Sequence, residues 1–353
     1  MAFARNHWYV VASTDEIGPA PLARTVCGDH LVLWRRSDAT ACALADRCSH
    51  RRFPLSLGSV VDDLLVCGYH GFTYDCAGTC VAVPGQTRIP TRADVRHYPL
   101  VELGPWAFVW MGDPDAPDMA RLPDAPWLAD PAWTVVSGMQ PLAARYELLV
   151  DNLLDLSHET FLHAGSIGTP EVAATPIEAE LDEDGPVVRV SRHMEGAQCP
   201  PFYQRSTGLT SPIDRWQDIE YTPPGFYVLH SRIAPAGVVP RADGSDPDAA
   251  HAKVLYGITP STETATYDFW LVARDFAPGD PEVDDYLATM NDEVVGQDVR
   301  ALAALEQRVA AEPDGAEVDI KIDRGGLAAR RALATVVAAE AGIAATAEPA
   351  GRP

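Results

Sequence analysis

Two cysteines and two histidines in the N-terminal third of the chain are spaced in a way that suits a metal centre. Cys48 and His50 form a Cys-x-His pair, and after sixteen residues Cys67 and His70 form a Cys-x-x-His pair. In a [2Fe-2S] cluster, thiolates can ligate one iron while imidazoles ligate the other. Structural zinc sites also use two cysteines and two histidines, but their motifs usually pair Cys with Cys and His with His. The mixed pairs therefore favour an iron–sulfur cluster.

A second group of metal-binding side chains lies between residues 151 and 163, where His158 and His163 are the expected nitrogen ligands. Two histidines and one carboxylate on one face of a non-haem Fe(II) leave the other positions open for O₂. On a regular helix, residues five apart point roughly 140° away from each other. We therefore expect the helix to end or distort between the two histidines, with a π-bulge as one form of the distortion.

The carboxylate of this second site must come from another part of the chain. Residues 284–311 are rich in helix formers with apolar residues at helical spacing, which predicts a long helix. Three acidic residues of that helix are candidates, and spacing alone does not choose among Asp292, Glu293 and Asp298.

The elements that must position these ligands differ along the chain. Short apolar runs separated by turn residues predict an all-β domain over residues 1–115. Five prolines and five aspartates between residues 112 and 132 predict an extended connector, so a second domain is expected over 116–353. Strand-like runs followed by the long helix and a last helix over 325–340 predict an antiparallel sheet that grips a helix. The fold class is therefore α+β.

Composition limits the kinds of partner. The chain has 353 residues, 47% of them apolar, and a formal net charge of −23. Such a negative surface argues against nucleic acid or a membrane as partner, and no apolar run approaches the ~20 residues that span a bilayer. Without a secretory signal, a cytoplasmic location is the expectation. The cysteine count of seven is odd, so a disulfide framework is not expected.

With both metal motifs in view, the chain resembles the Rieske non-haem iron oxygenases, and among them the oxygenase subunits of vanillate O-demethylase. The resemblance implies an N-terminal Rieske [2Fe-2S] domain with Cys48, His50, Cys67 and His70 as cluster ligands, followed by a helix-grip catalytic domain. Beyond the ligands, the likeness covers residues 54–58, 83–86, 155–160, 214–217, 258–260 and 320–326.

The resemblance also assigns roles within the second site. It implies that Asp298 joins His158 and His163 as the third ligand of a mononuclear Fe(II). It further implies that Asp155 bridges from His158 toward His70 of a neighbouring subunit, as a relay for electrons. Such a bridge requires an oligomer, and the family forms head-to-tail homotrimers.

The reaction implied by the resemblance is an O-demethylation. A separate flavin and ferredoxin-type reductase would pass electrons from NAD(P)H to the cluster, and O₂ would hydroxylate the methyl group of a small aromatic methyl ether. Vanillate, or a close methoxybenzoate, would give protocatechuate and formaldehyde. Two alternatives stay open: a Rieske monooxygenase or dioxygenase reaction on another aromatic compound, and a Rieske electron carrier fused to a ligand-binding domain.

Candidate substrate contacts are harder to place from the sequence. His230, Arg232 and Tyr256 lie on strands that are expected to line the cavity of the second domain. A cation or a hydroxyl group there would suit a substrate that carries a carboxylate.

Overall fold

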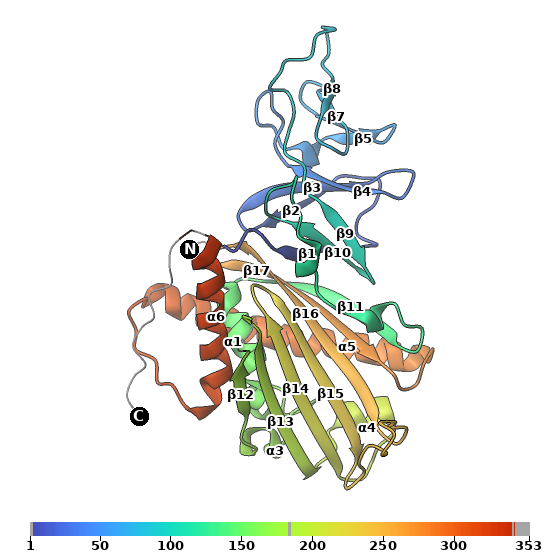
Figure 1. The fold of residues 1–353 in the computed structure, drawn as a ribbon, viewed down its shortest axis with the longest axis vertical. Coiled ribbons are helices and arrows are strands. Elements are labelled where there is room, and N and C mark those ends of the chain that lie inside the picture. Colours follow the sequence, from blue (N-terminus) through green and yellow to red (C-terminus); the bar gives the residue numbers. More distant parts are fainter. Residues whose placement is uncertain (1–2, 183–184, 341, 343–353) are drawn as a thin grey trace. The chain divides into compact units, whose positions relative to one another are not determined.

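The computed structural model describes residues 3–182, 185–340 and 342 (Figure 1). Residues 5–124 and 259–263 form one compact unit, and the other described residues form the second. The domain boundary expected at residue 115 falls near the end of the first of these stretches. The last residues of the expected second domain, 343–353, lie outside the described residues.

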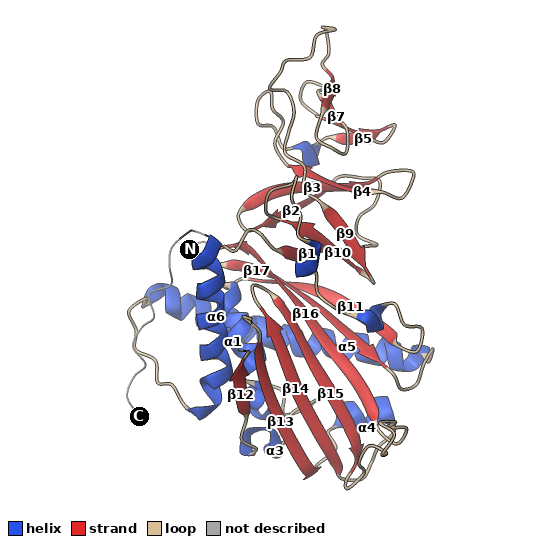
Figure 2. Cartoon of the chain, viewed as in Figure 1, coloured by secondary structure: helices blue, strands red, loops and turns tan. Residues whose placement is uncertain are grey.

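The first unit is built from strands, as predicted (Figure 2). Some of its strands are apolar along their whole length and are covered on both faces. All five residues of Trp106–Trp110 are buried, for example. Three sheets form, in the orders β1 (Trp8–Ser13), β10 (Trp106–Trp110), β9 (Leu100–Leu103); β2 (Leu22–Val26), β3 (Asp29–Arg35), β4 (Ala41–Ala45); and β5 (Ser59–Val61), β6 (Leu64–Val66), β7 (Thr73–Tyr74), β8 (Cys80–Ala82).

A disulfide in this unit was not expected from the odd number of cysteines. Cys42 of β4 is bonded to Cys76 in the turn after β7, with their Cα atoms 5.3 Å apart. An odd count argues against a complete framework of disulfides, but it leaves room for a single pair that the fold brings together. The expectation of no disulfide framework therefore missed this one pair, and Cys80 is a buried free thiol.

The second unit contains a seven-stranded antiparallel sheet, with the long helix α5 (Pro281–Ala311) packed against its edge strand β11. Helix α5 begins where Asp280 accepts hydrogen bonds from the backbone of Glu282 and Val283, which satisfies two free N–H groups. The strand order is β11 (Thr134–Leu142), β17 (Ala265–Arg274), β16 (Ala250–Thr262), β15 (Phe226–Pro235), β14 (Ile213–Thr222), β13 (Val188–Ala197), β12 (Glu178–Leu181).

One face of this sheet forms the core of the unit together with the helices. Tyr221, Tyr227 and Tyr256 are cross-strand neighbours on that face, all buried. Because side chains alternate along a strand, residues two apart share this inner face and their neighbours point the other way.

The remaining helices are α1 (Tyr146–Leu154), α2 (Glu159–Leu162), α3 (Pro170–Ala174), α4 (Pro201–Thr207) and α6 (Arg324–Glu340), with 3₁₀ turns η1 (Leu55–Leu57), η2 (Met119–Arg121), η3 (Pro126–Leu128), η4 (Leu156–His158) and η5 (Lys321–Asp323).

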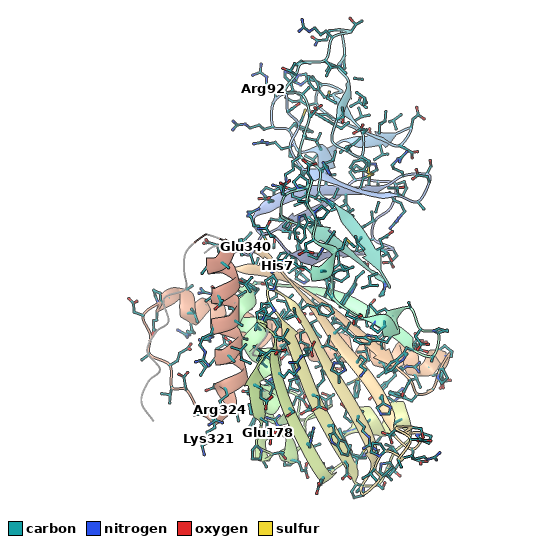
Figure 3. The ribbon with its side chains drawn as sticks, in the orientation of Figure 1. His7, Arg92, Glu178, Lys321, Arg324 and Glu340 are labelled. Carbon is teal, nitrogen blue, oxygen red and sulfur yellow. A yellow bond between two sulfur atoms is a disulfide. The ribbon has the colours of Figure 1, made fainter. Side chains whose placement is uncertain are left out.

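Helix α6 follows η5 directly, and Figure 3 places Lys321 and Arg324 at the start of this helix and Glu340 at its end. Among the described residues, no helix is both long enough and apolar enough to cross a membrane.

Candidate metal centres

The two cluster loops of the first unit repeat the same backbone geometry. In each loop the cysteine N–H bonds the carbonyl five residues ahead, and the cysteine carbonyl accepts the N–H four residues ahead. The residues at that fourth position, Arg52 and Gly71, both have positive φ, at 58° and 72°. Gly68 is required as well, because a Cβ there would lie 2.7 Å from the carbonyl oxygen of Leu57.

These loops bury the thiols and expose the imidazoles. Cys48 and Cys67 are each 2% exposed, whereas His50 and His70 are exposed. The two Nδ1 atoms lie 3.2 Å apart, with the rings 4.6 Å apart between centroids. Two imidazole nitrogens this close together, and two buried thiols, fit a [2Fe-2S] cluster in which the imidazoles ligate the outer iron and the thiolates ligate the inner one.

Tyr74 stands beside one of the thiols. Its hydroxyl lies 3.3 Å from Cys48 Sγ and 2.9 Å from Ser49 Oγ, and it accepts the Ser49 N–H. Burial and the contact with Cys48 raise the pKa of Tyr74, so the hydroxyl keeps its proton. A hydrogen bond to a ligand sulfur is one of the means by which a protein sets the reduction potential of a cluster.

In the second unit, the segment with the two histidines is broken as the sequence required. Helix α1 ends before Asp155, whose backbone leaves helical conformation at φ −121° and ψ 84°. The turn η4 then ends at His158, α2 continues for one turn, and His163 lies just beyond it. The expected break is therefore confirmed, but it takes the form of a 3₁₀ turn and a helix end; there is no π-bulge between the histidines.

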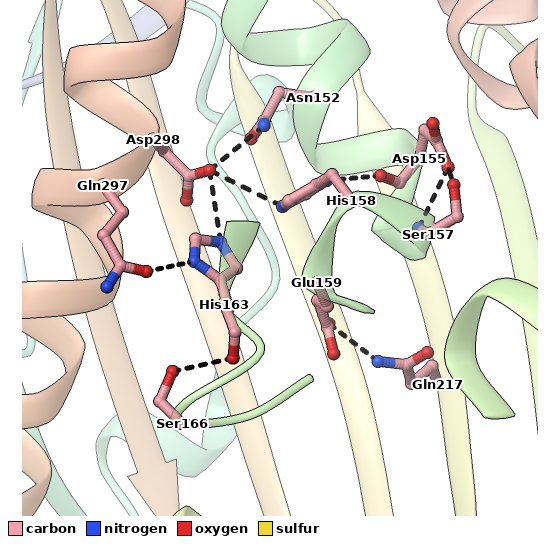
Figure 4. A network of polar contacts seen from close by, with 10 residues as sticks. All are labelled: Asn152, Asp155, Ser157, His158, Glu159, His163, Ser166, Gln217, Gln297 and Asp298. Atoms are coloured by element: carbon pink, nitrogen blue, oxygen red, sulfur yellow. Dashed lines mark hydrogen bonds and ion pairs between the residues drawn. The ribbon is translucent and has the colours of Figure 1, made fainter. Parts of the chain in front are cut away.

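The break brings the two imidazoles together with Asp298 of α5 (Figure 4). The Oδ1 atom of Asp298 is 3.5 Å from His158 Nε2 and 3.3 Å from His163 Nε2. Ligand atoms about 2.1 Å from one metal and at right angles to each other are about 3 Å apart, so this spacing suits a shared ion. Asn152 Nδ2 donates to the same oxygen at 3.1 Å.

The outer nitrogens of both rings already have acceptors. His158 Nδ1 is 2.6 Å from the carbonyl oxygen of Asp155, and His163 Nδ1 is 2.6 Å from Gln297 Oε1. Each ring therefore carries its proton on Nδ1 and directs the lone pair of Nε2 toward Asp298, which is the tautomer a metal ligand needs. His163 Nε2 is buried and has no hydrogen-bond partner within the described residues. The donor set fits a mononuclear iron.

Burial distinguishes the three acidic residues of α5 that spacing alone could not rank as the third ligand. Asp298 is buried, whereas Asp292 and Glu293 are exposed. Asp298 lies three residues after Val295 and four before Leu302, on the apolar stripe of α5 that faces the core. This position on the stripe is a signal that the sequence already contained.

Asp155 lies beside the triad, but its carboxylate does not contact His158 as the relay model implied. The contact to His158 is made by the Asp155 backbone carbonyl, while the carboxylate accepts the N–H and hydroxyl of Ser157 and so caps η4. The half-buried carboxylate lines a pocket of about 370 Å³ that also includes His158. Its role in electron transfer stays a prediction.

The three candidate substrate contacts are divided between the two faces of the sheet. Tyr256 is on the inner face, where burial raises its pKa and where the charges of Asp268 and Asp298 raise it further. His230 and Arg232 point to the opposite face, because they alternate with the inner residues of β15. There His230 bonds Lys253 at 2.7 Å and Arg232 pairs with Asp246 at 2.5 Å. The structure does not bring these two together with the triad.

Several buried charged residues of the second unit were not singled out from the sequence. Glu159 forms a buried ion pair with Arg215 of β14, 3.0 Å apart. Arg192 of β13 is 3% exposed, and its two terminal nitrogens have no hydrogen-bond partner within the described residues. Strand alternation could have placed Arg192 and Arg215 on the inner face, but the pairing with Glu159 depends on the tertiary fold.

Comparisons with known proteins agree with this geometry. The family of the Rieske [2Fe-2S] domain matches residues 7–99, and that of the vanillate O-demethylase oxygenase C-terminal domain matches residues 142–339. The chain is 34% identical to the vanillate O-demethylase oxygenase subunit of Pseudomonas sp. (strain HR199 / DSM 7063), with 96% of each protein covered. The chain belongs to the Rieske oxygenases, in the family of aromatic O-demethylases and monooxygenases.

Members of this family that act on different compounds are similar to the chain. The oxygenase component of dicamba O-demethylase from Stenotrophomonas maltophilia is 33% identical over 88% of this chain and 90% of its own length. A crystal structure of dicamba monooxygenase bound to 3,6-dichlorosalicylic acid superimposes with a TM-score of 0.90 at 29% identity, over 97% of this chain and 99% of that one. A Rieske [2Fe-2S] cluster and a non-haem iron site are typical of the family, and the chain is an aromatic oxygenase.

Proposed function

We propose that this Rieske oxygenase is the oxygenase component of an aromatic O-demethylase that converts vanillate, or a close methoxybenzoate, to protocatechuate and formaldehyde. The observation that carries the proposal is the convergence of His158, His163 and Asp298 within the unit that matches the vanillate O-demethylase family. The proposed cluster ligands are Cys48, His50, Cys67 and His70.

When bound, the cluster and the mononuclear iron supply stored electrons and the activation of O₂. Asn152 fixes the carboxylate of Asp298, and the Asp155 carbonyl and Gln297 fix the two rings. One methyl C–H becomes C–OH, and the resulting hemiacetal releases formaldehyde and the phenol. The balance is aryl methyl ether, O₂, two electrons and two protons giving phenol, formaldehyde and water.

Arg192 supports a substrate with an anionic group. Its guanidinium is buried; Nε donates to the carbonyl oxygen of Thr175 at 3.2 Å, but both terminal nitrogens lack a partner within the described residues, and a buried charge is costly unless it is paired. The adjoining void is about 10 Å³, room for one oxygen-sized group, and Gln217 also lines it. We propose that Arg192, in place of His230 and Arg232, receives one carboxylate oxygen of the substrate.

Charge complementarity supports a head-to-tail homotrimer. Exposed arginines lie in the first cluster loop and in the segment 83–93 of the first unit, and no carboxylate occurs in residues 47–53, 67–73 or 83–93; Figure 3 shows Arg92 on the last of these segments. The pocket at His158 in the second unit is lined by five acids and by one arginine, Arg330, which pairs with Asp151. We define the arginine rim as Arg47, Arg51, Arg52, Arg88 and Arg92, and the acids of the pocket are Asp151, Asp155, Glu317, Asp319 and Asp323.

A rim on one subunit that docks on this pocket of the next would bring His70 toward Asp155 and His158. We propose that the half-buried carboxylate of Asp155 then lies between the two centres and acts as the electron relay. A separate reductase is proposed as the source of electrons, as for other oxygenase components.

A turnover screen across methoxybenzoates tests the proposal. The protein, reconstituted with iron and sulfide and supplied with NADH and a compatible flavin and ferredoxin-type reductase, is incubated with each compound. We expect vanillate or a close analogue to yield one formaldehyde for each NADH consumed. A cis-diol product, or NADH consumption without formaldehyde from every ether tested, would contradict demethylation.

A further inference from the structure

We propose that Glu159, held by Arg215 and Gln217 of β14, is a positioning residue that sets the relative orientation of the two histidine ligands. The inference rests on the proposed iron site, because it concerns the segment that carries His158 and His163. Neither the family resemblance nor the spacing of the ligands assigns a role to this carboxylate.

The side-chain contacts of Glu159 use both of its oxygens. Oε2 accepts a hydrogen bond from Arg215 Nη2 at 3.0 Å, and Oε1 accepts one from Gln217 Nε2 at 2.9 Å (Figure 4 shows the second contact). The side chains of Glu159 and Arg215 are 4% and 3% exposed. Arg215 is itself held by the carbonyl oxygen of Ile167 and by the ring of Tyr203, 5.0 Å from its centroid. The carboxylate is therefore fixed to the sheet.

The backbone of Glu159 connects this fixed side chain to both histidine ligands. Glu159 follows His158 directly, and its carbonyl oxygen accepts the N–H of His163 at 3.1 Å. The chain also passes close by at Gly168, where a Cβ would lie 1.8 Å from the same carbonyl oxygen. A displacement of Glu159 would consequently move the two imidazoles relative to each other and to Asp298.

Stability alone does not explain a buried ion pair at this place. The cost of removing two charges from water offsets most of their attraction, and apolar residues of similar size often stabilise a core at least as well. Burial lowers the pKa of Arg215, but the charges and hydrogen bonds of Glu159 and Tyr203 together raise this pKa by more, so the guanidinium keeps its proton. A charge-assisted hydrogen bond from Arg215 and a second hydrogen bond from Gln217 fix the direction of the carboxylate more tightly than apolar packing does, which is what a ligand-bearing turn needs.

The test compares Glu159→Gln and Arg215→Met with a matched control, Glu306→Gln. Glu306 is also buried and also pairs with an arginine, Arg145, at 2.7 Å, but it does not contact the turn between the histidines. Each protein is reconstituted with cluster and Fe(II), and the rate of Fe(II) loss to ferrozine is measured while the cluster absorbance is followed. The visible spectrum of the Co(II)-substituted site is recorded in parallel.

We expect Glu159→Gln and Arg215→Met to lose the mononuclear iron roughly 10–100-fold faster than the wild type, as for other residues that orient metal ligands. The cluster absorbance should stay unchanged and the Co(II) spectrum should shift. Glu306→Gln should lower the thermal midpoint but leave both metal readouts as in the wild type. The double variant Glu159→Gln/Arg215→Met should be no faster than the faster single variant, because both act through one contact.

A folded Glu159→Gln protein that holds iron as long as the wild type would overturn the inference, and so would equal losses in Glu306→Gln. If Glu159→Gln fails to fold, Glu159→Asp keeps the charge with a shorter reach, and wild-type iron retention in that variant would overturn the inference as well. A wild-type protein that takes up no mononuclear iron would instead overturn the proposed iron site.

Discussion

The two metal centres of this chain are built in opposite ways. The cluster site consists of two short loops with the same hydrogen-bond pattern, and its imidazoles are exposed. The iron site joins a broken helix to α5, with His163 and its partner Gln297 separated by 134 residues, and most of its side chains are buried. The cluster site is thus a local structure, whereas the iron site depends on the packing of the whole unit.

This difference matches what each centre is proposed to do. A cluster that exchanges electrons with partner proteins needs an accessible edge, which the exposed histidines supply. An iron that activates O₂ needs ligands held in fixed orientations, which the contacts of Asn152, Gln297 and Glu159 supply. The contrast implies that substitutions at the iron site should leave the cluster intact.

The largest effect is expected from Asp298→Ala. Without the carboxylate, the mononuclear iron should be lost and formaldehyde production should fall to background, while the cluster absorbance is retained. Glu293→Ala is the control, because Glu293 lies on the same helix but is exposed. Iron analysis and turnover of both variants check the prediction; unchanged iron content in Asp298→Ala would mean that another acid is the ligand.

Asp155→Asn should come next, with turnover reduced about 10–100-fold or more while both metals are kept. The amide still caps η4, so the local fold should persist, but the proposed path between the centres is changed. Chemical reduction of the cluster followed by its re-oxidation under O₂ with substrate measures this path directly. Re-oxidation at the wild-type rate would remove Asp155 from the relay.

Arg192→Met should affect binding more than chemistry. The loss of a charge-assisted hydrogen bond, worth about 1.5–3 kcal/mol, should raise KM for vanillate by roughly ten- to a hundredfold. A neutral methoxyphenol that lacks the carboxylate should be affected much less, which controls for a general change in the core. Equal changes in KM for the two substrates would show that Arg192 does not receive the carboxylate.

The smallest effect is expected from reversing charge in the arginine rim. Arg51→Glu/Arg52→Glu should weaken the trimer several-fold, with the greatest loss at low salt, because exposed charges are screened as ionic strength rises. Sedimentation at several salt concentrations measures the assembly. Trimers that are unaffected at every concentration, or wild-type protein that is monomeric, would contradict head-to-tail docking through this surface.

The same contrast explains what the sequence could predict. The cluster ligands and the strands around them follow from local spacing, and the structure has the same long helix, last helix and antiparallel sheet. The alternation of side chains along a strand could also have predicted that His230 and Arg232 lie on the opposite face of the sheet from Tyr227 and Leu229, which lie on the inner face. The pairing of Glu159 with Arg215, 56 residues away, and the Cys42–Cys76 disulfide depend on tertiary contacts that no local pattern encodes.

The most direct test of two independent iron centres is the analysis of iron and acid-labile sulfide in the wild type and in His163→Ala after anaerobic reconstitution. The account predicts three irons and two sulfides per chain in the wild type, and two irons and two sulfides in the variant, with the same cluster spectrum. Two irons in both proteins, or zinc in place of iron, would contradict it.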